Sequence, residues 1–174
     1  MKICIDPGHG GADSGAVNGG LVEKDMTLVT AKALGAFLRG HGHQTLLTHT
    51  GALSEKTKLD VSARCLAANS WGAELLISCH YNAGGGDRAE IIRSAYRFTE
   101  QSEKLGSAIL ASLEPLGQNS GRIIVKKNAA ENNDYFGILR LSRCPALIIE
   151  PCFIDHAHDR TLADTPAKQK SVGV

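Results

Sequence analysis

Apolar residues follow two alternating patterns along the chain. Short runs that are almost continuously apolar are typical of strands covered on both faces, and longer segments with apolar residues every three or four positions are typical of amphipathic helices. The continuous runs predict buried strands at 3–5, 74–79 and 146–150. Weaker runs predict shorter strands at 44–48, 91–98 and 122–126. The helical spacing predicts helices over about 21–40, 59–69 and 102–113.

The alternation of strands with helices predicts an α/β fold. A chain of 174 residues fits a single domain, which we expect to be a twisted, mostly parallel sheet of about six strands with helices on both faces. Residues 136–141 fit either a short strand or a turn of helix, and 12–20 and 50–58 are expected to be loops. In the helix over 59–69, one face collects apolar residues and is expected to be buried: Leu59, Ala63, Leu66 and Ala67.

The charge balance and the apolar content exclude several classes of protein. Lys and Arg number 19 against 18 Asp and Glu, so the chain lacks the basic excess of a nucleic-acid-binding protein. No run of about 18 apolar residues predicts a membrane span. Five cysteines without a close pair are expected to be buried apolar residues in a reducing compartment, rather than a disulfide framework.

Polar residues capable of chemistry stand where three predicted strands end. His9 lies in the glycine-rich turn 6–11 after the first strand, His80 follows the strand 74–79, and Glu150 ends the last buried strand. Sites in such sheets form outside the carboxyl ends of the strands. We therefore expect these three side chains to share one site.

The residue types at this edge suit a catalytic zinc site, which uses three protein ligands and leaves a position for water. His9 and His80 supply two imidazoles, and Glu23, at a loop-to-helix junction, is the best third ligand. Glu150 is then the candidate acid and base, because burial would raise its pKa toward a useful value. Purely structural roles remain as alternative interpretations. Glu23 could be a carboxylate favoured at a helix start, and Glu150 could be a buried acid paired with Arg140.

Four motifs carry a resemblance to a known family. They are Ile-Asp-Pro-Gly-His-Gly-Gly at 5–11, the isolated Glu23 before a helix, Ser-Cys-His-Tyr-Asn at 78–82 and Ile-Glu-Pro-Cys-Phe-Ile-Asp at 149–155. In this order and spacing, from residue 3 to about 160, the chain resembles the zinc-dependent N-acetylmuramoyl-L-alanine amidases, which are peptidoglycan hydrolases. Each motif alone is weak, whereas the four together are specific.

The resemblance implies a zinc ion held by His9, Glu23 and His80, with Glu150 as the catalytic acid/base. It implies hydrolysis of the amide between the lactyl group of N-acetylmuramic acid and L-alanine, with Glu150 protonating the departing amine. Asn82 could contact the substrate or cap its own turn, and Arg140, which also fits the family's pattern, is a candidate substrate contact. Peptidoglycan is then the expected partner, without nucleic acid or membrane insertion, for a protein expected to be a monomer.

The ends of the chain affect where it is expected to act. Met1-Lys2 leads directly into a strand without the features of a secretory signal, so we expect action at the bacterial cell wall after release from the cytoplasm, as for an endolysin, or as a fragment of an exported protein. Pro166 suits the first position of a helix in the weakly patterned tail. Residues 1–174 are therefore expected to be an amidase catalytic domain that lacks the end of its C-terminal helix.

Some positions depart from the family's pattern or offer alternative sites. Thr48-His49 stands where the family often has Arg, Tyr81 where a small residue is usual, and Arg88-Ala89-Glu90 in place of Gly-x-Glu, so the substrate contacts stay open. The pair His41 and His43 and the pair His156 and His158 could bind metal, but a solvated loop and a surface helix start are the simpler interpretations.

Two other functions remain as alternatives. One is a wall-binding module with a structural metal, which would not need Glu150. The other is a zinc peptidase acting on a different amide.

Overall fold

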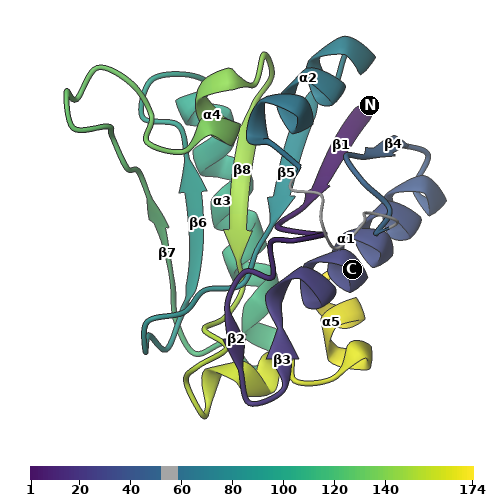
Figure 1. The fold of residues 1–174 in the computed structure, drawn as a ribbon, viewed down its shortest axis with the longest axis vertical. Helices are drawn as coiled ribbons and strands as arrows, with labels where there is room; N and C mark the ends of the chain where they lie inside the picture. Colours follow the sequence, from purple (N-terminus) through teal and green to yellow (C-terminus); the bar gives the residue numbers. More distant parts are fainter. Residues whose placement is uncertain (52–58) are drawn as a thin grey trace.

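The computed structural model of the protein describes residues 1–51 and 59–174. Its centre is a six-stranded sheet with the strand order β4-β1-β5-β8-β6-β7 (Figure 1). The strands, in that order, are Gln44–Leu47, Lys2–Pro7, Leu75–Cys79, Ala146–Glu150, Ala89–Arg93 and Gly121–Ile124. The first four are mutually parallel, whereas β6 runs antiparallel to β8 and carries β7 parallel to itself. The prediction of a mostly parallel sheet of six strands is confirmed.

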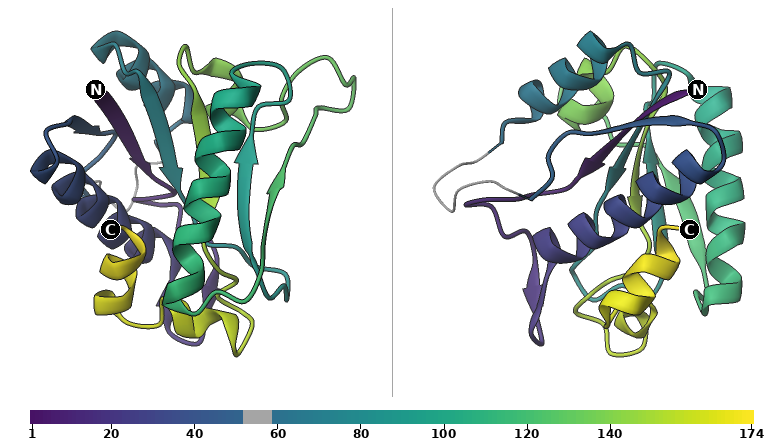
Figure 2. Two further views of the ribbon diagram at one scale, coloured as in Figure 1. Left: turned by 180° about the vertical axis from the view of Figure 1, so that it is seen from behind. Right: turned by 90° about the vertical axis from the view of Figure 1, so that its right-hand side faces the viewer.

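Helices cover both faces of this sheet, as predicted (Figure 2). One face carries α2 (Val61–Trp71) and α4 (Gly137–Leu141). The other carries α1 (Glu23–Gly40), α3 (Thr99–Leu113) and α5 (Pro166–Val172). The remaining elements are a small hairpin and two short 3-10 helices: β2 (Val17–Asn18), β3 (Leu21–Val22), η1 (Glu114–Leu116) and η2 (Asp159–Leu162).

The alternation of side chains along the strands divides the core between the two faces. On β1, Cys4 packs in the cluster beneath α2 and α4, while Ile3 and Ile5 pack in the cluster beneath α1. On β5, Leu76 and Ile77 divide in the same way. All five cysteines are buried and free, which confirms their prediction as small core residues.

Several predicted boundaries differ from the structure. The strand predicted at 91–98 begins at Ala89 and ends at Arg93, because the buried Asp134 carboxylate accepts bonds from the Ser94 hydroxyl and the Ala95 N–H and turns the chain there. Residues 136–141 contain a helix, α4, rather than a strand. The loop expected at 12–20 includes β2, and the loop predicted at 50–58 lies almost entirely outside the described residues.

The predicted buried face of the second helix is wrong. Helix α2 buries Arg64, Cys65 and Ala68, whereas Leu66 is 65% exposed. The small Cys65 and Ala68 fit against the sheet and α4, and Arg64 is held by contacts with the end of β1. The helix is thus turned so that a charged residue, rather than a leucine, faces inward.

The contrast between the exposed Leu66 and the buried Leu76 gives a test of the core. Leu76 is completely buried, so replacement by Ala should lower the free energy of unfolding by about 3 kcal/mol through lost apolar contact and a residual cavity. Leu66→Ala is the matched control and should change it by less than about 0.5 kcal/mol. Urea titrations of both variants measure the difference, and equal losses would contradict the assignment of the buried face.

Candidate metal centre and active site

The turn after β1 brings the first candidate ligand to the carboxyl edge of the sheet. His9 adopts a positive φ of 62°, which is uncommon for a residue with a side chain. Arg64 holds this backbone in place, since its guanidinium donates to the carbonyl oxygens of Pro7 at 2.6 Å and His9 at 2.5 Å. A β carbon on Gly8 would lie 2.5 Å from the Cε1 atom of His80, so glycine allows the second imidazole to lie against this turn.

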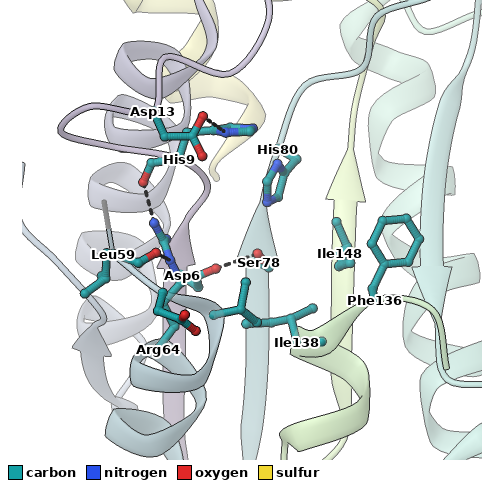
Figure 3. A pocket seen from close by; sticks show the side chains of 13 residues that line it. Asp6, His9, Asp13, Leu59, Arg64, Ser78, His80, Phe136, Ile138 and Ile148 are labelled. Atoms are coloured by element: carbon teal, nitrogen blue, oxygen red, sulfur yellow. Dashed lines mark hydrogen bonds and ion pairs between the residues drawn. The ribbon is translucent and has the colours of Figure 1, made fainter. Parts of the chain in front are cut away.

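Arg64 is itself fixed by a buried carboxylate. Asp6, which is 1% exposed, accepts bonds from Arg64 Nη1 at 2.8 Å, the Thr48 hydroxyl at 2.6 Å and the Ser78 hydroxyl at 2.7 Å. A buried ion pair of this kind persists when the remaining lone pairs are also satisfied. The network joins α2 to β1, to β5 and to the residue that follows β4, and Figure 3 shows Arg64, Asp6 and Ser78 within it. His49 adds a further contact, from its Nε2 to the Pro7 carbonyl oxygen at 2.9 Å.

Glu23, the first residue of α1, lies between the two imidazoles. Its Oε2 is 3.0 Å from His9 Nε2, and its Oε1 is 3.1 Å from His80 Nδ1. The three candidate ligand atoms all lie within 4.8 Å of one another. Backbone N–H groups of Ala16 and Tyr81 donate to the same carboxylate at 2.9 and 3.0 Å.

The electrostatics of the three residues are coupled. Burial alone would raise the pKa of Glu23, but hydrogen bonds from His80 and His9 hold that pKa well below its usual range. For His9, burial alone would lower the pKa, but Glu23 and then Asp13 raise it above its usual value. The arrangement therefore strongly favours positive charge between the imidazoles and the carboxylate.

A divalent metal ion fits this donor set. A zinc ion bonded at about 2 Å in tetrahedral geometry separates its ligand atoms by roughly 3.3 Å, and one ligand atom from each of the three residues lies within 4.8 Å of the other two. His9 Nδ1 lies 3.1 Å from Asp13 Oδ1, so a proton on Nδ1 would leave Nε2 free to bind metal. Gly15 also matters here, because a β carbon on it would lie 2.5 Å from Glu23 Oε2. The structure thus brings together the three residues predicted as ligands.

Glu150 lies next to this group at the end of β8. Strands β5 and β8 pair with Cys79 beside Ile149, and the His80 N–H donates to the Ile149 carbonyl oxygen at 2.9 Å. His80, which follows β5, and Glu150, the last residue of β8, therefore lie at neighbouring positions at the ends of two adjacent parallel strands. Burial raises the pKa of Glu150 to about 7, and the carboxylates of Glu90 and Glu23 add to the rise against the opposing effect of His80.

A cavity of about 520 Å³ opens beside His9 and His80 (Figure 3). It lies on the face of the sheet covered by α2 and α4, over Asp6, Ser78 and Arg64. Its apolar wall consists of Val61, Phe136, Ile138 and Ile148. A substrate group of modest size can thus approach the two imidazoles from this side.

The two predicted substrate contacts lie in different surroundings. Asn82 Oδ1 accepts a bond from the Ala83 N–H at 2.8 Å, and its Nδ2 donates to Glu90 Oε2 at 3.0 Å. Arg140 donates from Nη1 to the carbonyl oxygens of Asp134 at 2.7 Å and Tyr135 at 3.1 Å. Asn82 caps its own turn, and Arg140 secures the loop before α4, while their predicted contacts with substrate stay predictions.

The histidines proposed as alternative metal sites have partners outside the group of three candidate ligands. His41 is exposed in the turn after α1, where its Nδ1 lies 2.9 Å from the Phe37 carbonyl oxygen. His156 and His158 precede η2, and their Nδ1 atoms lie 3.4 and 3.3 Å from one oxygen of Asp87. Among the described residues, only His9, Glu23 and His80 form a compact group of three potential metal ligands.

The support for the site was largely missed by sequence reasoning. A role for Asp6 in orienting a ligand fits its position in the turn, but its partners are not predictable from the sequence, and Thr48 and His49 stand out there only as departures from the family's pattern. Their spacing from His9 gives no indication of contact, because the contacts join different strands. One cue was present: Asp6 belongs to an otherwise apolar strand, and a buried carboxylate requires partners.

The fold and site together define an α/β domain with a candidate metal-binding active site at the carboxyl edge of its sheet. Residues 3–174 match the family described as N-acetylmuramoyl-L-alanine amidase, and the chain belongs to that family.

Curated relatives agree with this assignment. The chain is similar to the N-acetylmuramoyl-L-alanine amidase CwlM of Bacillus licheniformis, with 34% identity over 159 residues, covering 91% of this chain and 59% of the relative. The sporulation-specific N-acetylmuramoyl-L-alanine amidase of Bacillus subtilis is 34% identical over 161 residues, covering 91% and 58%. The endolysin of Bacillus phage SPP1 is 30% identical over 172 residues, covering 92% and 57%. The chain thus spans less than 60% of the length of these three relatives.

Solved structures show the same fold. Cwp6 from Clostridium difficile matches with a TM-score of 0.80 and 27% identity, over 99% of this chain and 27% of that chain. The N-acetylmuramoyl-L-alanine amidase AmiC2 of Nostoc punctiforme matches with a TM-score of 0.79 and 26% identity, over 99% and 91%. Within the described part of the chain, no helix has the length and apolar character needed to span a bilayer.

The buried pair beneath the site gives a testable prediction. Arg64→Met should lower the free energy of unfolding by about 3 kcal/mol, because it leaves the Asp6 carboxylate buried without its cation. The double variant with Asp6→Asn should recover part of this loss. Lys104→Met, which breaks an exposed pair with Glu100, is the control and should cost less than about 0.5 kcal/mol. Denaturant titration measures all three, and an equal effect of the control would argue against a buried pair.

The raised pKa of Glu150 predicts a pH-dependent gain in stability on replacement. Because the folded-state pKa is about 7, above the ordinary 4.5, the stability that protonated Glu150 contributes is complete below pH 4.5 and is lost as the pH rises through 7. Glu150→Gln cannot ionise, so its advantage over the wild type should grow across this window to at most about 3 kcal/mol. Unfolding of both proteins in chelator, measured from pH 4.5 to 8, tests this, and a difference independent of pH would contradict it.

Proposed function

We propose that this chain is a zinc-dependent amidase that hydrolyses the bond between N-acetylmuramic acid and L-alanine in peptidoglycan. The observation that carries the proposal is the convergence of His9, Glu23 and His80 beside the partly buried acid Glu150. Membership of the amidase family supports the choice of substrate. The names of the relatives, which include a sporulation-specific amidase and an endolysin, support action at the bacterial cell wall.

The residues divide into a metal-holding group and a proton-transferring group. His9, Glu23 and His80 would hold the zinc ion, and Asp13 would keep His9 in the tautomer that can bind it. When bound, zinc supplies Lewis-acid chemistry that polarises an amide carbonyl and acidifies water. The turn held by Arg64 keeps His9 in position for this role.

Glu150 would transfer the proton. A carboxyl group with a pKa of about 7 is present in both protonation states near neutral pH, which suits a group that first accepts and then donates a proton. It would take a proton from the attacking water and deliver it to the departing amine of L-alanine. The cavity lined by Val61, Phe136 and Ile148 would admit substrate groups flanking the scissile amide, with Asn82 and Arg140 as candidate contacts.

Hydrolysis of purified cell wall tests the proposal. New L-alanine amino termini should appear with the wild type, disappear in chelator and return with added zinc. Glu150→Gln should retain zinc yet lose at least about 100-fold in rate, because proton transfer is removed. Glu103→Gln, a partly exposed glutamate on α3, is the matched control and should keep the wild-type rate.

The alternatives predict different outcomes. Activity that survives both chelator and Glu150→Gln would refute the amidase mechanism. Binding of wall fragments without release of amino termini would favour a wall-binding module. Cleavage of simple peptides lacking muramic acid would favour a zinc peptidase.

A further inference from the structure

Two carboxylates face each other across adjacent strands next to the site. Strands β6 and β8 are antiparallel, and their register sets Glu90 directly opposite Glu150. Such pairs have Cβ atoms about 5 Å apart and project to the same face of the sheet, and like charges in this position are destabilising. Glu90 is only 5% exposed, so water does not relieve the repulsion. The arrangement must therefore be maintained by other contacts.

The side chain of Asn82 lies between the two carboxylates. Its Nδ2 donates to Glu90 Oε2 at 3.0 Å, and the Asn82 side chain, as a hydrogen-bond donor, also acts to lower the pKa of the Glu150 carboxyl group. Its Oδ1 is occupied by the Ala83 N–H, which fixes which end of the amide faces the carboxylates. The Asn82 backbone is held on both sides, through Cys152 and Ile154 at 2.9 Å each. A rigid amide thus links one carboxylate to the other.

Glu90 is anchored from the opposite side by two arginines. Its Oε1 accepts bonds from Arg88 Nε at 2.7 Å and from Arg122 Nε and Nη2 at 3.0 and 2.7 Å. These charge-assisted bonds occupy Oε1 and leave Oε2 aimed at Asn82. Hydrogen bonds thus run from the arginines to Glu90 and from Asn82 to Glu90, and the Asn82 side chain interacts in turn with Glu150.

We propose that Glu90 is a positioning residue for the reaction: it orients the Asn82 amide, which in turn fixes the Glu150 carboxyl group beside His80. This inference rests on the proposed amidase function. Glu90 is not among the three candidate metal ligands, and its carboxylate bonds to Arg88, Arg122 and Asn82. A residue that served only to tie β6 to β7 would need the arginines but not Asn82.

The test begins with Glu90→Gln assayed on purified cell wall. The single carbonyl oxygen of Gln would serve the arginines, so an NH2 group would face the Asn82 amide and turn it away. We expect kcat to fall about 10- to 100-fold with KM and zinc content unchanged. Asp134→Asn, a matched loss of charge at a carboxylate that is 1% exposed, should leave kcat unchanged. A crystal structure of the variant should show the Asn82 amide rotated away from residue 90.

A double variant separates positioning from general damage. If Glu90 acts through Glu150, then Glu90→Gln should cause no further loss of rate in the Glu150→Gln background. Asn82→Ala removes the link itself, so it should lower kcat to a similar extent. It should likewise cause no further loss of rate when combined with Glu150→Gln. Asn82→Ala decides the question if Glu90→Gln does not fold.

The outcomes distinguish this inference from the proposed function. A wild-type protein that does not cleave cell wall overturns the amidase proposal and, with it, the role of Glu90. An active wild type with unchanged kcat in Glu90→Gln and Asn82→Ala overturns only the positioning role. A rise in KM, a loss of zinc, or an equal loss in the Glu150→Gln background would likewise overturn it.

Discussion

The buried carboxylate of Glu23 is the interaction on which the site depends. With 4% exposure it cannot rely on water, and a buried charge without partners costs several kcal/mol. Two imidazoles and two backbone N–H groups supply those partners from three separate segments. Helix α1 has Val22 at its N-cap and no side-chain cap, and its first residue, Glu23, is a carboxylate of the kind that the positive end of a helix favours. The convergence of ligands and the start of α1 are one electrostatic arrangement.

The buried ion pair between Asp6 and Arg64 supports the site that contains Glu23. Glu23 can meet His9 only if the turn after β1 holds a positive φ, and Arg64 secures that turn through two carbonyl oxygens. Arg64 can be buried only because Asp6 neutralises it. Two groups of buried charges therefore occupy the carboxyl edge of the sheet. The pair of Asp6 and Arg64 is structural, whereas Glu23 with its imidazole partners is available for chemistry. This division explains why α2 turns a charged residue inward and leaves Leu66 exposed.

How much of the structure the sequence predicts depends on how far apart along the chain the interacting residues lie. Buried strands, helices and the strand ends at His9, His80 and Glu150 depend on local patterns, and the structure has the predicted elements there. The sequence predicts that these residues share one site, because the carboxyl ends of parallel strands meet at the same edge of a sheet. The partners of Asp6 come from residues 42 to 72 positions away, which no local pattern encodes. The early end of β6 has the same origin, since Asp134 turns the chain after Arg93 from 40 positions away.

The reversal of β6 has a consequence that a fully parallel sheet would not allow. In the parallel strands, only the last residues reach the edge that carries the site. Because β6 runs against β8, its second residue, Glu90, reaches that edge and pairs with Glu150, the last residue of β8. Strand β7 runs parallel to β6 and therefore adds Arg122 at the same level. A change of strand direction thus allows residues at the start of two strands to flank the acid at the end of a third.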